Sequence, residues 1–436
     1  MTRYDLTPLL QPLLKNRLPQ FIIQAIALGG FIFAIIAGLV GTPVGNHNFS
    51  IVFVWIGWWA LLMLIAVPLF GRAWCSICPI PLAGEWLQHG AILKPTGKGF
   101  GLNLRWHNKF RNIWLQNISF TLVALFSAVV LTQPNITSIV LIAFLFVAFA
   151  ASLIFERRAF CRYLCPVGGF IGLYSQVAPI EVRVKDSAVC ASHTEKSCYI
   201  GNAEGYGCPW QVYPGGLSKN TYCGTCMECL RTCPHDNVAI QIRPIGDDLI
   251  KPHGRKLDEA FKAFIMLGSA MTYSAVMLGS WGQLKAAAYA VGTSAWALYA
   301  ITFLVFIFGA LPASFFIATS FNRKSFINFA YALIPLGLLA WIAFSLSFVF
   351  ANASYLLPAI SDPLGWGWNL FGTVNFKWTP FLTQVTPTLQ AAALIIGLAW
   401  SSQVAMQIGE QIKANAQGVI AFCFVITLGM LWLLVG

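Results

Sequence analysis

Seven of the 12 cysteines lie between residues 183 and 258, and four of these form one tight run. The run reads Cys223-Gly-Thr-Cys226-Met-Glu-Cys229-Leu-Arg-Thr-Cys233-Pro234, which is the C-x2-C-x2-C-x3-C-P spacing of iron–sulfur ligands. Three thiolates at such short intervals can hold one cubane, whereas zinc sites ordinarily use two separated C-x2-C pairs. The run therefore predicts a 4Fe–4S cluster.

A second, stretched half of the motif lies upstream. In two-cluster modules the cysteine before proline ligates the other half's cluster, and Cys208-Pro209 corresponds to Cys233-Pro234. This assigns to the first cluster Cys208, Cys223, Cys226 and Cys229. The second cluster receives Cys190, Cys198 and Cys233, which leaves it one thiolate short. The missing ligand stays open between His193, a carboxylate such as Asp186, a cysteine from the two membrane pairs described next, and no ligand at all, which would give a 3Fe–4S cluster.

Two further cysteine pairs follow apolar stretches in matching positions. One reads Arg72-Ala-Trp-Cys75-Ser-Ile-Cys78-Pro79, and the other reads Arg158-Ala-Phe-Cys161-Arg-Tyr-Leu-Cys165-Pro166. On a helix, cysteines three or four residues apart share one face, and the prolines then leave backbone carbonyls without donors. The duplication favours a further metal or redox centre built from Cys75, Cys78, Cys161 and Cys165 over simple packing. Metal binding, donation to a cluster and reversible disulfides remain alternatives.

The elements that must position these cysteines are membrane helices. Of the 436 residues, 58% are hydrophobic and 10% are charged, and a bilayer span needs about 20 mostly apolar residues. Nine stretches qualify: about 20–40, 51–71, 113–132, 135–155, 261–281, 293–317, 327–351, 389–408 and 418–435. The expected fold is mainly α, a polytopic membrane protein of about nine transmembrane helices with an inserted ferredoxin-like double-cluster module.

The basic residues predict how these spans are oriented. With the N-terminus inside, only Lys285 and Lys377 of the 27 Lys and Arg residues fall outside. The positive-inside rule then gives an N-in, C-out topology in a bacterial inner membrane, with the cluster module in the reducing cytoplasm, where disulfides are disfavoured. Because topology accounts for most of the net charge of +12, a nucleic-acid partner is not expected.

Three parts of the chain follow from this pattern. Residues 1–182 form two duplicated transmembrane hairpins, 183–258 form the cytoplasmic module, and 259–436 form a five-helix membrane domain. The cores of the spans lack Asp, Glu, Lys and Arg, which argues against an ion pump. The sequence has no C-x-x-C-H haem motif and no phosphate-binding loop, and no catalytic residue is assigned.

At these residues the sequence resembles the membrane polyferredoxins of the NapH/NosR type, which are the quinol-dehydrogenase membrane subunits of periplasmic nitrate reduction and their relatives in nitrous-oxide respiration. That family has four spans, Cys-x3-Cys-Pro motifs after the second and fourth, and a cytoplasmic double-cluster module. The match covers residues 20–245, through Cys161–Pro166 and Cys223–Pro234. Cys75-x2-Cys78 is one residue short of the family motif, and the five spans after residue 260 have no counterpart.

The resemblance implies an electron-transfer subunit of an oxidoreductase complex, a quinol dehydrogenase. Its expected partners are membrane lipid, quinone or quinol, and other subunits of a redox complex. Two alternatives stay open: a copper-handling or maturation factor that uses the membrane cysteine pairs, and a structural anchor subunit that docks through its last five helices.

Overall fold

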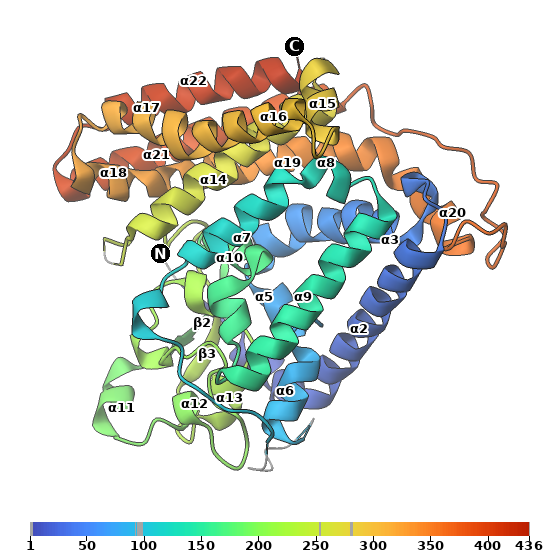
Figure 1. Ribbon diagram of the computed structural model, residues 1–436. Coiled ribbons are helices and arrows are strands. Elements are labelled where there is room, and N and C mark those ends of the chain that lie inside the picture. The colour runs from blue at the N-terminus through green and yellow to red at the C-terminus, as the bar shows by residue number, and fades with distance from the viewer. Residues whose placement is uncertain (1–2, 92, 94–98, 253, 280–281, 436) are drawn as a thin grey trace. The chain divides into compact units, whose positions relative to one another are not determined.

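The computed structural model describes residues 3–91, 93, 99–252, 254–279 and 282–435. It is mainly helical, with eight helices long and apolar enough to cross a membrane among the described residues, which confirms the predicted fold class (Figure 1). The eight are Arg17–Val40 (α2), Phe49–Phe70, Pro134–Ile154 (α9), Leu257–Leu278, Ser294–Ala318, Arg323–Ser361, Thr386–Ile412 (α21) and Gln417–Leu434 (α22).

The predicted stretch 113–132 differs from the other eight because it forms two short helices. Trp114–Leu125 (α7) and Ser127–Val130 (α8) are separated by Phe126, whose backbone leaves the helical region. The first helix carries the polar side chains Gln116, Asn117 and Thr121, which are buried. Because α7 ends after 12 residues, it is by itself shorter than a bilayer requires.

Several spans combine helices of different kinds. The Phe49–Phe70 span contains two π-helical segments, Val52–Trp58 (η2) and Leu61–Ala66 (η3), and ends in Val67–Phe70 (α4). The remaining elements of the later spans are Leu257–Tyr273 (α14), Ser274–Leu278 (η8), Ser294–Val305 (α16), Phe306–Ala310 (η9), Leu311–Ala318 (α17), Arg323–Phe329 (α18), Leu333–Asn352 (α19) and Leu356–Ser361 (α20). Gly282–Tyr289 (α15) precedes α16.

The chain forms two compact units, each assembled from segments that are far apart in the sequence. Unit 1 comprises residues 1–32, 65–116 and 141–248, and unit 2 comprises 33–64, 117–140 and 249–436. All 11 cysteines assigned above therefore belong to unit 1, and Cys423 belongs to unit 2.

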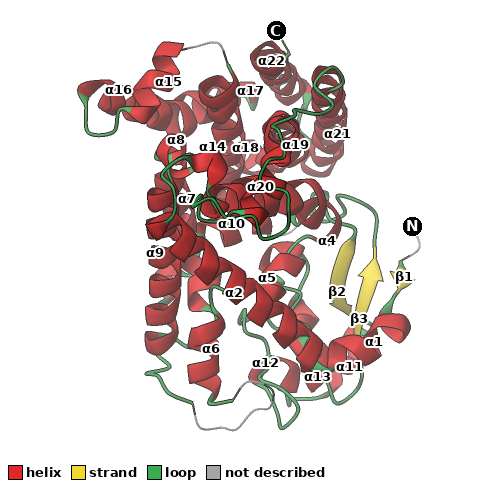
Figure 2. Cartoon of the chain, turned by 90° about the vertical axis from the view of Figure 1, so that its right-hand side faces the viewer, coloured by secondary structure: helices red, strands yellow, loops and turns green. Residues whose placement is uncertain are grey.

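A three-stranded antiparallel sheet frames the cluster-binding segment of unit 1. Its order is β1 (Tyr4–Asp5), β3 (Val238–Ile242) and β2 (Ile180–Val184), as Figure 2 shows. Ile180 pairs with Ile242 and Val184 pairs with Val238, so that the two longer strands bring together the two ends of the segment that holds the seven cysteines. Residues near the N-terminus contribute β1, a strand that was not predicted from the sequence pattern.

A small apolar core lies beside this sheet. Val182, Leu230, Val238 and Ile240 are buried together, and Thr7–Lys15 (α1) packs leucines against them. Cys223, Cys229 and Cys233 also pack against this core. The helices of the segment are short: Ser187–Ser192 (α11), Ser197–Ile200 (α12) and Glu228–Thr232 (α13). So few apolar contacts are typical of a domain that depends on metal ligation for its stability.

Unit 2 packs long apolar helices and also buries charges near the start of one span. Helix α14 begins four residues before the predicted span and includes Asp258, Glu259 and Lys262, all of them buried. The hydroxyl of Tyr331 donates to Glu259, and the Lys262 ammonium lies 4.6 Å from the centre of the Phe120 ring. The apolar cores of the spans were predicted from the sequence, but this buried polar group at the helix start was not.

Candidate iron–sulfur site

The four cysteines assigned to the first cluster line one cavity in unit 1. Cys208, Cys223, Cys226 and Cys229 share it with the apolar side chains of Val182, Trp210, Val212, Pro214, Leu217, Tyr222 and Met227. Helix α13 carries Cys229, whereas the other three thiols come from loops. Burial raises the pKa of the Cys208 and Cys223 thiols, so these ligands would release protons when they bind iron.

The loop that carries Cys223 and Cys226 is tightly curled. Thr225 and Met227 have φ angles of 46° and 63°, in the left-handed region that non-glycine residues rarely occupy. At Gly224 a Cβ atom would lie only 1.7 Å from Nε1 of Trp210. Backbone strain of this kind is concentrated at functional sites. The curl lets three cysteines of a seven-residue stretch line one cavity.

Two buried donors beside this cavity have no hydrogen-bond partner among the described residues. They are Nε1 of Trp210 and the hydroxyl of Thr225, and both residues line the cavity. The backbone N–H of Val212 donates to the sulfur of Cys208 at 3.4 Å. Buried donors ordinarily have acceptors. A cluster with sulfide and thiolate sulfurs would supply them, so the residues present fit a 4Fe–4S cluster.

The spacing of the thiols does not suit a single zinc ion. Among the described residues, no three cysteine sulfurs lie within 4.8 Å of one another. Tetrahedral zinc with bonds of about 2.3 Å would hold its sulfurs roughly 3.8 Å apart. The described acidic group that is compact enough, Glu181, Asp247 and Asp248, is paired with arginines instead: Arg3, Arg183 and Arg243.

The three cysteines assigned to the second cluster also come together. Asn237 donates through its side-chain amide to the sulfur of Cys190 at 3.3 Å and through its backbone N–H to the sulfur of Cys233 at 3.4 Å. Burial raises the pKa of Cys198 to about 11, and the neighbouring thiols of Cys233 and Cys190 raise it too. This group contains three thiols, as the sequence spacing indicated.

The duplicated pairs form a separate group of four thiols. Cys75 lies on the short helix Ala73–Ile77 (α5), and Cys78 follows it. Cys161 lies in the π-helical turn Phe160–Leu164 (η5), and Cys165 caps the helix Pro166–Tyr174 (α10), where its sulfur accepts from Gly168 N–H at 3.2 Å. Burial raises the pKa of Cys161, and the other three thiols lie near enough to raise it further.

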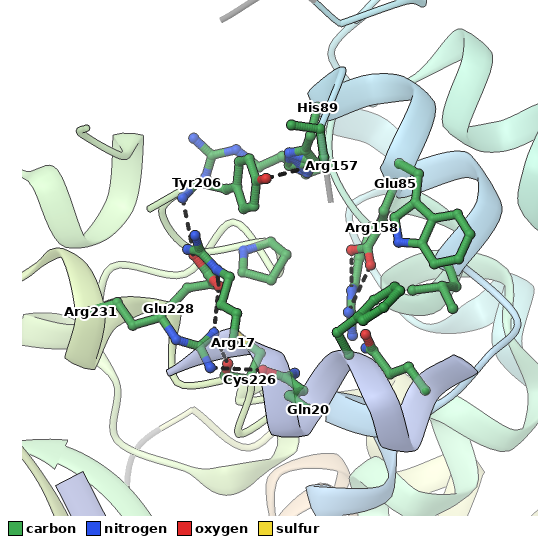
Figure 3. Close-up of a pocket in the computed structure, with 16 residues that line it drawn as sticks. Arg17, Gln20, Glu85, His89, Arg157, Arg158, Tyr206, Cys226, Glu228 and Arg231 are labelled. Atoms are coloured by element: carbon green, nitrogen blue, oxygen red, sulfur yellow. Dashed lines mark hydrogen bonds and ion pairs between the residues drawn. The ribbon is translucent and has the colours of Figure 1, made fainter. Parts of the chain in front are cut away.

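The arginine of each copy of the duplicated motif lies against the other copy. Arg158, from the second copy, donates to the carbonyl of Cys75 at 2.6 Å and forms a two-point ion pair with Glu85. Figure 3 shows this pair at one side of a pocket.

Arg72, from the first copy, approaches the second copy so closely that a Cβ atom at Gly172 would lie 2.7 Å from its Nη1. The Arg72 guanidinium donates to the carbonyl of Thr221 and stacks on Trp210 at 4.0 Å. Its Nε and Nη2 are buried without a partner among the described residues. The two arginines thus place positive charge beside the four thiols.

The pocket in Figure 3 was not predicted from the sequence. It measures about 690 Å³ including its open mouth, and it lies within unit 1. Sixteen residues line it: Arg17, Gln20, Phe21, Gln24, Leu82, Glu85, Trp86, His89, Ala91, Arg157, Arg158, Tyr206, Pro209, Cys226, Glu228 and Arg231. Cys226 therefore contributes both to this pocket and to the cavity of the first cluster.

Two glutamines of helix α2 connect this pocket to the membrane cysteines. The side-chain amides of Gln20 and Gln24 donate to the carbonyl of Ser76 at 2.7 and 2.8 Å. Ser76 lies between Cys75 and Cys78. The sequence held a signal for this contact, because two amides four residues apart in an otherwise apolar span lie on one helical face.

Comparison with known proteins supports this chemistry. The family described as "4Fe-4S binding domain" matches residues 51–98 and again 137–184, which are the segments that contain the duplicated cysteine pairs. The protein named "Putative electron transport protein YccM" from Escherichia coli K12 is 29% identical over 121 residues, which cover 27% of this chain and 28% of that protein.

An uncharacterized protein of Methanocaldococcus jannaschii is 29% identical over 101 residues, covering 23% of this chain and 36% of its own. The chain thus spans about a third or less of the length of these relatives. No solved structure matches. The fold and the site define a polytopic membrane protein whose residues fit at least one iron–sulfur cluster.

Proposed function

We propose that this chain is a subunit of a redox complex that takes electrons from quinol in a bacterial inner membrane and passes them through its clusters to a partner redox protein. One observation carries the proposal: the open pocket and the cavity of the first cluster share Cys226 as a wall. A donor bound in the pocket would touch a ligand of the cluster that it reduces.

The lining of the pocket suits a planar ring with hydroxyl groups. Phe21 and Trp86 pack together with ring centres 5.6 Å apart, and His89 lies 3.8 Å from the ring centre of Tyr206. The guanidinium of Arg17 covers Tyr206 at 4.5 Å. Sites for small ligands ordinarily combine aromatic walls with a few converging polar groups, which is the composition found here.

Quinol oxidation releases two electrons and two protons and leaves quinone. Each cluster accepts one electron, so two clusters can take up both. Burial lowers the pKa of His89, which keeps its imidazole neutral at pH 7 and able to accept a proton from a quinol hydroxyl. Glu228 also lines the pocket, where it is paired with Arg17 and Arg231, and the second proton would leave through the open mouth of the pocket to water.

The proposal includes a further redox or metal centre, formed by the four thiols of the duplicated pairs. Arg72 and Arg158 would offset the negative charge of thiolates there, and Gln20 and Gln24 tie the Cys75–Cys78 turn to the helix that lines the pocket. Copper handling is the competing function, because thiolates also suit Cu(I). Stoichiometric copper without quinol-driven cluster reduction would favour that alternative.

Two contacts support the nine crossings on which the proposed N-in, C-out orientation depends. Strand β1 pairs with β3, which keeps the N-terminus on the side of the cluster module. Gln116, near the start of α7, donates to the carbonyl of Cys161 at 3.0 Å, just beyond the end of α9. Because α9 has 21 residues and is about 31 Å long, the chain from 116 to 134 has to travel that length. This favours nine crossings.

Anaerobically purified protein tests the proposal. A quinol should bleach the cluster absorbance, and Tyr206→Ala should slow this reaction about tenfold or more, because the pocket loses the ring that packs on His89. The chemical reductant dithionite should still reduce the clusters fully in this variant. Tyr4→Ala is the control, because Tyr4 is exposed on strand β1 and does not line the pocket. Unchanged quinol kinetics in Tyr206→Ala would contradict the proposed site.

A further inference from the structure

In the upstream half of the cluster motif, a histidine occupies a position that is a ligand position in the standard run. In the downstream run, Cys226 follows Cys223 after two intervening residues, and His193 follows Cys190 at the same interval. His193 therefore stands where the standard run has its second cysteine. Imidazole is an accepted replacement for thiolate on iron in iron–sulfur proteins.

The structure fixes the tautomer of this imidazole. Nδ1 of His193 lies 2.7 Å from the carbonyl oxygen of Val189. A carbonyl can only accept, so Nδ1 carries the proton and Nε2 carries the lone pair. Metal-binding histidines almost always donate their other N–H in this way. Val189 directly precedes Cys190 in helix α11, so this bond also ties the ring to the helix that holds a cluster ligand.

The ammonium group of Lys196 holds together the loop between Cys190 and His193. Nζ of Lys196 donates to the carbonyl of Cys190 and to the carbonyl of His193, both at 2.7 Å. The Tyr213 hydroxyl donates to the same Cys190 carbonyl at 3.1 Å. The loop is thus held in a compact form that keeps His193 near Cys190. The side chain of His193 is half-buried, as expected for a ligand at the edge of a small module.

The other candidates for the fourth ligand are used elsewhere. The Asp186 carboxylate caps helix α11 by accepting from Ala188 N–H at 2.7 Å, and Asp186 is exposed. The four thiols of the duplicated pairs form their own group. His235 packs against His193 with ring centres 4.6 Å apart, but it is exposed and follows Cys233-Pro234 in the chain.

We propose that Nε2 of His193 is the fourth ligand of the second cluster, which it completes together with Cys190, Cys198 and Cys233. This inference rests on the proposed function only for the presence of a second cluster. A neutral imidazole in place of a thiolate makes the cluster less negative, and such replacement raises the reduction potential. The second cluster would then be the more oxidising of the two, and electrons would move from the first cluster to the second.

Pulsed EPR of the reduced protein tests the ligand directly, without any turnover. The second cluster should show a strongly coupled nitrogen that is absent from the first. In His193→Ala, the second cluster should lose one iron or be lost altogether, and the spectrum of the first cluster should remain. His193→Cys should keep all the iron, lose the coupled nitrogen and shift the second cluster to a lower potential.

His235→Ala is the matched control, because it removes the ring in contact with His193 from an exposed position, and it should keep both spectra. Wild-type protein without a coupled nitrogen, or His193→Ala with full iron and unchanged spectra, would overturn the assignment. If the coupled nitrogen is lost in His235→Ala but kept in His193→Ala, the ligand is His235 instead. Because dithionite can reduce the clusters for these measurements, failure of quinol oxidation would leave this test intact.

Discussion

The guanidinium of Arg158 donates to the carbonyl of Cys75 at 2.6 Å, so the arginine of one copy of the duplicated motif holds the cysteine turn of the other. Arg158 is also paired with Glu85, and both side chains are largely buried. Removing one partner of a buried pair leaves an uncompensated charge and costs about 3–5 kcal/mol. Arg158→Ala should therefore lower the thermal stability of the detergent-solubilised protein strongly.

The exposed pair Lys15–Asp236, with a separation of 2.8 Å, provides the control for this prediction. Lys15→Ala should change the free energy of unfolding by about 1 kcal/mol or less. The double variant Arg158→Ala/Glu85→Ala should lose less stability than the sum of the two single variants. If the stability lost in the double variant equals the sum of the two single losses, Arg158 and Glu85 have no coupling energy.

Cys226 offers the sharpest test of the first cluster. Cys226→Ala should remove one cluster, which would roughly halve the iron content of the module and destabilise it, because ligation supplies folding free energy. Cys423→Ala is the control: Cys423 is also buried but lies in helix α22 of unit 2. Iron analysis and EPR measure the outcome, and full iron content in Cys226→Ala would refute the ligand assignment.

Gly224 should tolerate no side chain. In Gly224→Ala the new methyl group would overlap the ring of Trp210, so the loop between Cys223 and Cys226 would have to open. We expect reduced iron content and a lower midpoint of thermal unfolding. Gly216→Ala is the control within the same segment, because its nearest atom would be Cδ1 of Tyr213 at 3.9 Å. Equal behaviour of the two variants would show that the close approach of Trp210 does not matter.

The four thiols of the duplicated pairs should be needed for quinol-driven electron transfer. Cys75→Ala and Cys161→Ala should each abolish reduction of the clusters by quinol, and serine at either position should fail as well because the chemistry depends on thiolate. The EPR signal of the first cluster, generated with dithionite, should persist in these variants. Alanine variants with wild-type quinol kinetics would show that the pairs only pack.

Membrane orientation can be measured with reporter fusions. A reporter fused near Lys219 should behave as cytoplasmic, and one fused at the C-terminus should behave as periplasmic, because Lys and Arg residues are concentrated on one side of nine crossings. The opposite pair of results would overturn this orientation: without a crossing at α7 and α8, Lys219 would lie after three crossings and the C-terminus after eight.

The sequence could predict those features that depend on short-range patterns. The apolar runs indicated the helices because each run is long enough to span a bilayer on its own, and the spacing from Cys223 to Cys233 indicated cluster binding because neighbouring residues supply the ligands. Trp210 could not be assigned to the cluster cavity, since its position depends on Gly224 and on stacking with Arg72, which is 138 residues away in the sequence.

Helix boundaries and long-range polar contacts were also beyond the sequence pattern. The break at Phe126 follows no glycine or proline signal. The predicted span began at residue 261, whereas helix α14 begins at Leu257 and includes the buried Asp258, and burial of a charge depends on tertiary packing. The pocket was missed for the same reason, since its lining comes from three separate stretches of unit 1.

Strand β1 has a consequence for biosynthesis. Tyr4 and Asp5 pair with Ile242 and Gln241, and Leu6 N–H donates to the carbonyl of Ile240 at 2.8 Å. At about 5–20 residues per second, the ribosome needs tens of seconds or less to reach β3 after making β1, and the first hairpins enter the membrane in that interval. The N-terminal segment must therefore remain unpaired until residues 238–242 have been made. Iron can be inserted into the complete module only after residue 242 has emerged from the ribosome.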